Sequence, residues 1–413
     1  MLVLMVDTLR PDHLGCYGYG RDTSPRLDRW AEDAALFERA YSHGTHTRIA
    51  TASLFTGTLP TVHRIENVEL KPGPGGENVT DGLAGSLTTW AESLGAAGYE
   101  TWALSANPHI TAELGFAQGF THFWETGERS GGAMVDAFLA RLEQRESDRP
   151  LFAYLHLMDP HNPYTPPVEY RYLFDVPLGK RRYKNGEIEV SERDLDWSVA
   201  QYDGEIRHLD DLLAGLLEAW EADTWRPRAT LLISDHGEEF LEHGGMGHGT
   251  TVHEELARTA LIAKGPGIAP GRRTDPVAHV DVHRLVLELA GVAPAPEAQG
   301  RPFSTWKSTE PELLTLARSG DWALRSGAFT LIEPGEGDTR AVRAWYDRSA
   351  DPSEQVPRGM DEVGATSLAD ALAALRLRDA ETARRLGTPE RLSLLSETIG
   401  ELKKIGYLGG DEH

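Results

Sequence analysis

The chain has 413 residues, of which 40% are hydrophobic, so it can bury a core large enough for one big α/β domain or for such a domain with a smaller companion. Aspartate and glutamate number 64 against 41 lysine and arginine residues, which gives a formal net charge of -23. An acidic surface repels nucleic acid and anionic membranes, so we expect neither as a partner. A small anionic substrate stays open, because a metal ion reverses the local field inside a single cleft.

Cys16 is the single cysteine, so no intrachain disulfide can form. No apolar run approaches the length of a membrane span. The sequence passes from Met1 directly into an apolar run, with no basic leader and no cleavage site of small residues. These features predict a cytoplasmic protein without a membrane segment, with the loss of a leader as the alternative.

Four apolar runs predict the strands of a parallel sheet, because each reads as a strand buried on both faces. They are residues 2–6, 101–105, 151–155 and 229–233. Between them lie helical patterns: one stripe consists of Leu83, Leu87, Trp90 and Leu94, with Gly98 placed to end it, and a longer stripe runs from 199 to 220. Alternating strands and helices predict an α/β fold, a large mostly parallel sheet flanked by helices on both faces.

The pattern changes near residue 305. Residues 322–332 read as two short strands around a Ser-Gly turn, and 367–385 as a helix rich in alanine, leucine and arginine. We therefore expect a catalytic α/β domain over 1–305 and a small C-terminal α+β subdomain over 306–413 that carries a short antiparallel sheet. Residues 162–195 are rich in proline, tyrosine and charge, which predicts a surface excursion that shapes the pocket.

Polar residues follow the predicted strands at the edge where ligands of parallel sheets bind. They are Asp7, Asn107, Asp159 and Asp235, and three of the four are acidic. The top of the sheet is therefore expected to bind a cation.

Four polar segments together contain the parts of a metal-assisted ester hydrolysis. They are residues 7–19, 45–57, 156–164 and 234–249. The sequence resembles the sulfatase branch of the alkaline phosphatase superfamily, and the resemblance extends in order over nearly the whole chain. The matching motifs are DTLR at 7–10 with GCYG at 15–18, ASLFTG at 52–57, DPH at 159–161, SDHG at 234–237, HVD at 279–281, YD at 346–347 with DP at 351–352, and IGY at 405–407.

The resemblance implies roles for individual residues. Asp7, Asp235 and His236 match the metal ligands of the family. Thr47 stands five residues before Ala52, where sulfatases carry a cysteine that is oxidised to formylglycine, so Thr47 is implied as the nucleophile and a fourth ligand. Two histidines, His161 and His248, match positions near the bound ester, and many sulfatases have a lysine at the latter.

The sequence departs from the sulfatase pattern after the nucleophile. Ile49 and Thr51 stand at the usual proline and arginine positions, so formylglycine chemistry is not expected. Members of the alkaline phosphatase superfamily that have threonine at this position resemble phosphatases, phosphodiesterases and phosphoryl-group transferases. Arg48 is close enough to compensate for the missing arginine, and we expect Arg48 and Asn107 to contact substrate.

Two carboxylates, one imidazole and one alkoxide favour Zn²⁺ or Mn²⁺, with Ca²⁺ or Mg²⁺ possible although both prefer more oxygen ligands. One ion is favoured because the clear ligands suffice for one. A second ion held by Asp159, His161 and His248 is the alternative.

These features predict a metal-dependent hydrolase that cleaves a phosphate ester or diester of a small anionic molecule through a covalent Thr47 intermediate. His161 or His248 would protonate the leaving oxygen or bind a non-bridging oxygen. Alternatives are a sulfate-ester or phosphonate-ester hydrolase with the same site, a phosphoryl-group transferase, and a catalytically inactive binding protein on this scaffold.

Overall fold

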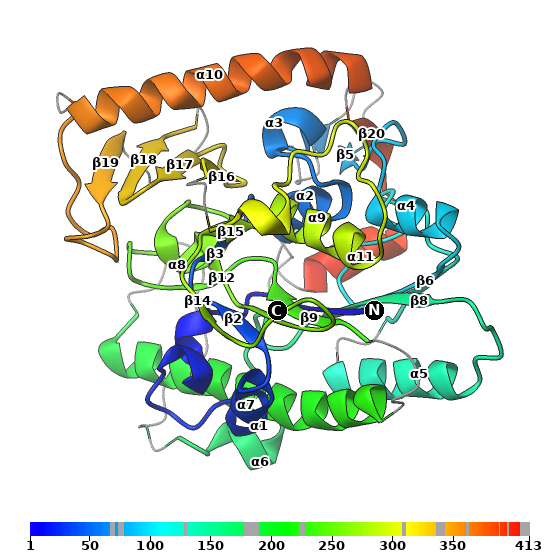
Figure 1. The fold of residues 1–413 in the computed structure, drawn as a ribbon. Helices are drawn as coiled ribbons and strands as arrows, with labels where there is room; N and C mark the ends of the chain where they lie inside the picture. Colours follow the sequence, from blue (N-terminus) through cyan, green and yellow to red (C-terminus); the bar gives the residue numbers. More distant parts are fainter. Residues whose placement is uncertain are drawn as a thin grey trace.

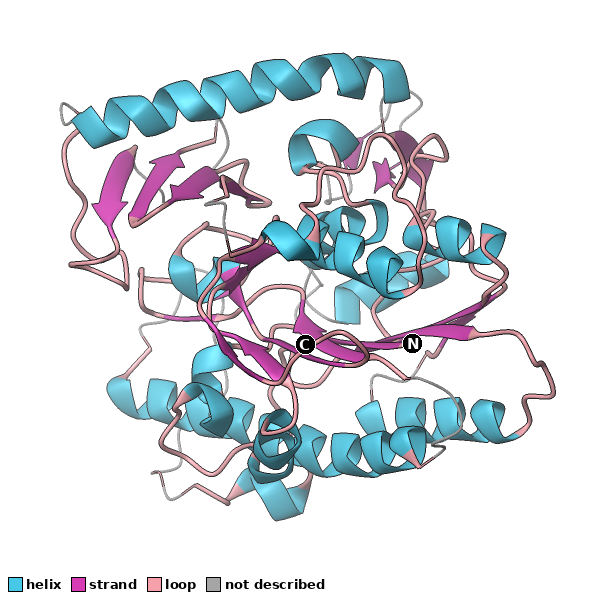
Figure 2. Ribbon diagram, viewed as in Figure 1, coloured by secondary structure: helices cyan, strands magenta, loops and turns pink. Residues whose placement is uncertain are grey.

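A computed structural model shows a large central sheet with helices on both faces (Figures 1 and 2). The structure describes residues 1–66, 71–72, 78–127, 130–174, 176, 190–222, 228–307, 311–335, 343–360, 363–387, 389–394 and 396–404. The predicted α/β fold class is confirmed.

The central sheet has eight strands in the order β14-β2-β13-β9-β1-β8-β6-β7. Their bounds are β1 (Leu2–Val6), β2 (Ala35–Phe37), β6 (Glu100–Ser105), β7 (His122–Glu125), β8 (Leu151–Leu157), β9 (Thr230–Ser234), β13 (Leu261–Lys264) and β14 (Gly271–Arg273). All neighbours are parallel except at β13, which runs antiparallel to β9 and to β2. The four runs predicted as strands are confirmed as β1, β6, β8 and β9.

Alternate residues of β1 enter two different cores. Leu4 packs in the core beneath α7 (Glu192–Glu221), α5 (Gly131–Glu143) and α1 (Pro25–Ala31). Met5 packs in the core beneath α2 (Thr47–Thr56), α4 (Trp90–Ala96) and α9 (His279–Leu289). Figure 1 shows these two groups of helices on opposite faces of the sheet. A strand buried on both faces explains why the run is continuously apolar.

The helix expected from the stripe at 83–94 begins later than the stripe. Thr89 caps α4: its Oγ1 accepts from the N–H of Glu92 (3.1 Å), and the Glu92 carboxylate accepts from the N–H of Thr89 (2.8 Å). This capping box fixes the helix start at Trp90. Leu83 and Leu87 precede the helix and still pack in the same core, so their spacing reflects shared burial.

The register of the sheet aligns the strand ends that carry polar residues. Val6 at the end of β1 pairs with Leu157 of β8 and Ser234 of β9. The next residues along β1 and β9, Asp7 and Asp235, therefore leave the sheet at the same edge.

The C-terminal part forms a second, antiparallel sheet. Its strands are β16 (Leu313–Leu316), β17 (Trp322–Ser326), β18 (Phe329–Glu333) and β19 (Ala344–Asp347). Strands β17 and β18 flank the predicted Ser-Gly turn, which confirms the hairpin. Helix α10 (Val363–Leu386) covers this sheet and contains the helix predicted at 367–385 (Figure 1). The domain boundary after residue 305 stays a prediction.

The end of the described chain returns to the larger part, since β20 (Glu390–Ser393) pairs with β5 (Asn78–Gly82). The expected excursion at 162–195 contains α6 (Val168–Arg171), but residues 175 and 177–189 lie outside the described residues, as does the motif at 405–407. Within the described ranges, no helix combines the length and the apolar character that a membrane crossing requires. The cellular compartment stays a prediction.

Candidate active site

Asp235 lies at the carboxyl end of β9 and is fully buried. Its Oδ1 accepts hydrogen bonds from the backbone N–H of Thr8 (3.0 Å) and of His236 (2.8 Å). These bonds fix one oxygen of the carboxylate. The other, Oδ2, lies 3.3 Å from His236 Nε2.

Asp7 follows β1 and is also fully buried. Its Oδ2 accepts from the side-chain amide of Asn107 (2.6 Å) and lies 3.3 Å from Nε2 of His156. Asn107 Oδ1 in turn accepts from the N–H of His109 (2.7 Å), so both ends of that amide are engaged. Asp7 is thus held through Oδ2.

The remaining carboxylate oxygens, Asp7 Oδ1 and Asp235 Oδ2, are buried and have no hydrogen-bond partner within the described part of the chain. One ligand atom from each of Asp7, His156 and Asp235 lies within 4.8 Å of the other two. Buried carboxylate oxygens without a partner are costly, and convergence of two of them beside imidazoles fits a divalent cation. These residues therefore suit a metal ion.

The pKa values of the two carboxylates move in opposite directions. Burial raises the pKa of Asp235, and the neighbouring charge of Asp7 raises it further. Burial also acts to raise the pKa of Asp7, but the nearby imidazoles of His161, His156 and His236 hold it below its ordinary range. Two close carboxylates disfavour joint ionisation unless a cation lies between them.

Thr47 is the first residue of α2 and is fully buried. The preceding residue, His46, caps the helix by accepting the N–H of Arg48 at Nδ1 (3.2 Å). The Thr47 hydroxyl lies 3.3 Å from His236 Nε2. His236 Nδ1 lies 2.9 Å from the carbonyl of Gly237, which can only accept a hydrogen bond, so Nδ1 is the donor of this contact and Nε2 is the nitrogen that faces Thr47 and Asp235. The positive end of the helix dipole favours an anion at this position.

The structure thus brings together the four residues expected as ligands. Asp235 and Thr47 each lie 3.3 Å from His236, and Asp7 shares the candidate metal group with Asp235. Their assignment as ligands stays a prediction.

His156 also belongs to this group, together with Asp7 and Asp235. It lies in β8, where all seven residues are buried, and its Nδ1 is 2.8 Å from the hydroxyl of Tyr154. A histidine inside an apolar buried strand was the available signal, because such a residue needs polar partners on both nitrogens.

His248 lies next to His236, and His161 lies next to His248. The ring of His248 is centred 4.5 Å from that of His236 and 4.9 Å from that of His161. His161 Nδ1 is 2.6 Å from the carbonyl of Asn162. His248 Nδ1 is 2.8 Å from Glu238, a fully buried carboxylate that the sequence reasoning missed. Burial acts to lower the pKa of His248, but Glu238 raises it above its ordinary value.

The guanidinium group of Arg48 is fully buried. It donates to the hydroxyl of Thr80, to the carbonyl of Asp81 (3.0 Å) and to His109 Nδ1 (2.8 Å). These bonds tie the start of α2 to β5 and to the loop after β6. The substrate contacts expected of Arg48 and Asn107 stay predictions.

Among the described residues, the alternative ligands of a second ion, Asp159, His161 and His248, do not form a group whose ligand atoms converge. Asp159 accepts the N–H of Gly131 at the start of α5 (2.8 Å), and burial raises its pKa. Within the described residues, Asp7, His156 and Asp235 form the one group of three that could hold an ion. The number of ions stays a prediction.

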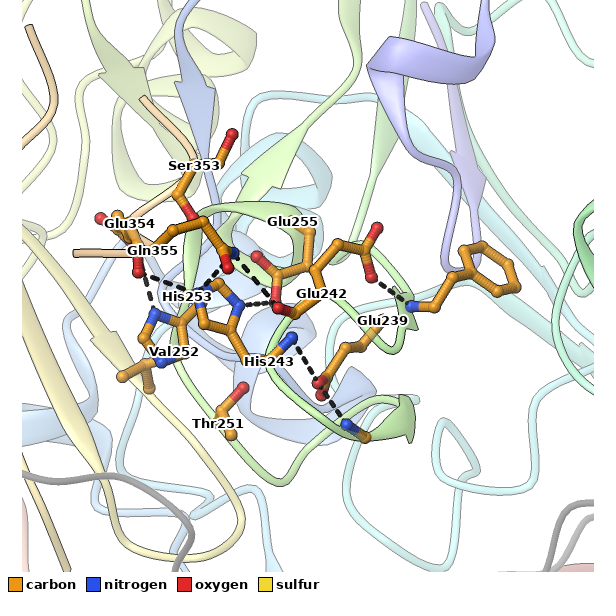
Figure 3. A network of polar contacts seen from close by, with 12 residues as sticks. Glu239, Glu242, His243, Thr251, Val252, His253, Glu255, Ser353, Glu354 and Gln355 are labelled. Carbon is orange, nitrogen blue, oxygen red and sulfur yellow. Dashed lines mark hydrogen bonds and ion pairs between the residues drawn. The ribbon is translucent and has the colours of Figure 1, made fainter. Parts of the chain in front are cut away.

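The loop that carries His248 is fixed to the C-terminal part by a polar network (Figure 3). His243 Nδ1 lies 2.7 Å from Glu255, its Nε2 lies 2.9 Å from the carbonyl of Glu354, and its ring stacks on that of His253 at 3.5 Å. Burial acts to lower the pKa of His243, but Glu255 raises it to about 9. The segment after β19 therefore helps to position the loop that carries His248.

A parallel sheet whose strand ends hold two buried carboxylates, next to a hydroxyl at a helix N-terminus, is an arrangement that fits metal-assisted ester hydrolysis. The chain belongs to the sulfatase family of the alkaline phosphatase superfamily: the Sulfatase family model matches residues 1–292.

Curated relatives agree with this membership. The choline-sulfatase of Rhizobium meliloti (strain 1021) is 24% identical over 460 aligned positions, which cover 91% of this chain and 86% of that protein. The arylsulfatase of Clostridium perfringens (strain 13 / Type A) is 22% identical, over 71% of this chain and 73% of that protein.

Solved structures share the fold. The phosphonate monoester hydrolase of Agrobacterium radiobacter has a TM-score of 0.72 at 18% identity, with 92% of this chain and 95% of that chain covered. A 2-O GAG sulfatase also has a TM-score of 0.72, at 16% identity, with 94% of each chain covered. The protein is a sulfatase-family hydrolase, and these two neighbours differ in the ester that their names indicate, a phosphonate ester for one and a sulfate ester for the other.

Proposed function

We propose that this protein hydrolyses a phosphate ester or diester of a small molecule through a phosphoryl group carried on Thr47. The observation that carries the proposal is the position of the Thr47 hydroxyl at the N-terminus of α2, 3.3 Å from His236 and beside the buried Asp7 and Asp235 pair. Asp7, Thr47, Asp235 and His236 would hold one divalent cation, with Zn²⁺ or Mn²⁺ expected and Ca²⁺ or Mg²⁺ as alternatives.

When bound, this cation supplies positive charge that favours an ionised hydroxyl and neutralises charge developing on the ester. The Thr47 hydroxyl gives its proton to a solvent water, and its oxygen, which faces the positive end of α2, forms a bond to phosphorus while the bond to the leaving oxygen breaks. His248 or His161 gives a proton to the leaving oxygen. Water then attacks the phosphorus of the Thr47 ester, which restores the hydroxyl and releases phosphate or, from a diester, the remaining monoester.

The choice of phosphorus over sulfur follows from the chemistry of threonine. Its Cβ carries one hydroxyl, so the covalent ester can be released only by attack of water on the central atom. Formylglycine as a hydrate has a second hydroxyl on the same carbon and can expel the ester group by itself. A threonine nucleophile therefore suits a phosphoryl group, which water can displace from an alcohol oxygen with the help of a cation.

Assays on four esters test this proposal. The purified protein, stripped of metal and resupplied with Mn²⁺, Zn²⁺ or Ca²⁺, should turn over p-nitrophenyl phosphate or bis-p-nitrophenyl phosphate faster than p-nitrophenyl sulfate or a phenylphosphonate ester. Thr47→Ala should abolish turnover, and Thr47→Ser, which keeps a hydroxyl, should retain part of it. Full activity of Thr47→Ala would refute the assignment of Thr47 as the nucleophile.

Faster turnover of the sulfate or the phosphonate ester would favour the second candidate, which the names of the choline-sulfatase and the phosphonate monoester hydrolase support. Transfer of the phosphoryl group to an added alcohol in place of water would indicate a transferase. Absence of turnover with every metal would favour a binding protein on this scaffold.

A further inference from the structure

The C-terminal sheet reaches into the segment that precedes the nucleophile. Leu316 at the end of β16 donates its N–H to the carbonyl of His43 (3.0 Å) and accepts the N–H of Thr45 (3.0 Å). Gly44 forms a parallel bridge with Leu316. The chain that leaves β16 is therefore fixed beside the residues that lead into Thr47.

Two residues further on, Arg318 lies between this segment and the loop of His248. A methyl group built on Gly249 would lie 3.6 Å from Cβ and Nε of Arg318 and 3.6 Å from the carbonyl of Thr45. Ser319 donates its N–H to the carbonyl of Gly249 (3.3 Å). Since Gly249 directly follows His248, the half-buried Arg318 borders the site at its rim.

The charge of Arg318 also acts on a histidine close to the nucleophile segment. Burial lowers the pKa of His109, and the guanidinium of Arg318 is among the charges that lower it further. His46 precedes Thr47, and the rings of His46 and His109 are centred 4.6 Å apart.

An anionic substrate would bring negative charge into the site, and a further positive group would be needed to balance it. Ionised Asp7 and Asp235 carry two negative charges, which one divalent cation would balance. Glu238 is paired with His248 at 2.8 Å. These groups leave the charge of an incoming ester without compensation.

Two other arginines near the site lie deeper in the protein. Arg10 is buried and Arg48 is fully buried. Arg318 is half-buried, so of the three arginines it is the most accessible to a substrate at the rim of the site.

We propose that Arg318 is a substrate-binding residue that takes the second negative charge of a phosphate ester, so that the preferred substrate is a dianionic monoester. This inference rests on the proposed function and narrows its substrate class. A hydrogen bond from a guanidinium to an ionised oxygen is among the stronger polar contacts, and it favours the ester with two charged oxygens over the diester with one.

Steady-state kinetics of Arg318 variants test the inference. For Arg318→Ala and Arg318→Gln, kcat/KM on p-nitrophenyl phosphate should fall about tenfold to a hundredfold, and on bis-p-nitrophenyl phosphate less than about threefold. Arg318→Lys, which keeps the charge, should recover part of the loss. The control Arg343→Ala removes an exposed arginine that pairs with Glu333, and it should leave kcat/KM on both esters unchanged.

Thermal melting and bound metal, measured for each variant, separate binding from folding. Equal losses on the two esters, or no loss on either, would overturn the inference. A second readout is the affinity of the metal-loaded protein for inorganic phosphate by calorimetry, which should weaken about tenfold in Arg318→Ala.

The phosphate readout also distinguishes the two proposals. If the unmodified protein turns over neither ester, the proposed function fails; weaker phosphate binding by Arg318→Ala would still uphold the anion site, and unchanged binding would overturn it. If the unmodified protein turns over the esters and Arg318→Ala changes kcat/KM equally for both, the substrate inference fails while the proposed function stands.

Discussion

Asp7 is held by two groups through the same oxygen. Asn107 donates to Oδ2, and His156 Nε2 faces Oδ2 with its other nitrogen on the Tyr154 hydroxyl. Oδ1 is left buried and without a hydrogen-bond partner in the described structure. Groups that orient a ligand in this way typically change metal affinity by about 10- to 100-fold when removed.

Removal of the Tyr154 hydroxyl should therefore weaken metal binding. Tyr154→Phe keeps the ring in the core but takes away the partner of His156, so the dissociation constant for Zn²⁺ or Mn²⁺ should rise about tenfold. Competition with a chromogenic chelator measures this. Tyr170→Phe is the matched control, because the Tyr170 hydroxyl pairs with Asp211 on α7. Equal metal affinity of the two variants would contradict the role of Tyr154.

Single residues were predictable where a sequence signal marked them. Asp7 and Asp235 follow apolar strands, and sheet topology alone brings their ends together. His156 and Glu238 were missed as site residues, because their roles depend on contacts with groups distant in the sequence or across a turn: Asp7 for the first and His248 for the second.

At the scale of elements, α2 positions the nucleophile. It begins at Thr47 and ends at Thr56, and the following residue, Gly57, has a left-handed φ of 67°. A Cβ on Gly57 would lie 2.5 Å from Cδ2 of His283, a fully buried side chain of α9. The helix is thus fixed at both ends, by the cap at His46 and by this close approach.

Gly57→Ala should destabilise the protein more than Gly98→Ala. Both glycines have positive φ, which costs alanine about 1 kcal/mol, but Gly98 has open space around it. The clash with His283 should add about 1–3 kcal/mol at Gly57. Urea unfolding of the two variants gives the difference directly, and equal free energies of unfolding would show that the contact with His283 is unimportant.

Strands and helices were predicted to different precision. The buried strands were evident because parallel strands covered on both faces are continuously apolar. The start of α4 was not, because a capping box outweighed an apolar spacing that shared burial also produces. The attachment of β16 beside Gly44 depends on long-range pairing that no local pattern specifies.

At the scale of the whole molecule, buried neutral histidines make the fold sensitive to acid. Burial lowers the pKa of His63 to about 3, of His279 to about 3 and of His283 to about 4. In the unfolded chain these histidines take up protons as the pH falls through about 6.5, whereas in the folded protein they stay neutral. The free energy of unfolding is therefore highest above that pH and decreases as the pH falls toward the folded pKa values. Between pH 7.5 and 5.5 the three together should cost about 4 kcal/mol.

His283→Gln tests this sensitivity. His283 Nδ1 lies 3.0 Å from the carbonyl of Leu54, a bond that a glutamine amide can also donate. The loss of unfolding free energy between pH 7.5 and 5.5 should be smaller than in the unmodified protein by about 1.4 kcal/mol. Urea unfolding at the two pH values measures it. An identical pH dependence would mean that His283 is not a source of the acid sensitivity.

The most direct test of the proposed chemistry is to trap the covalent intermediate. The metal-loaded protein is mixed with p-nitrophenyl phosphate or bis-p-nitrophenyl phosphate, quenched in acid within one turnover, and digested for tandem mass spectrometry. We expect a phosphoryl group, or its p-nitrophenyl ester from the diester, on Thr47, and none in Thr47→Ala. Steady turnover with the adduct on another residue, or with undiminished activity in Thr47→Ala, would contradict a threonine nucleophile.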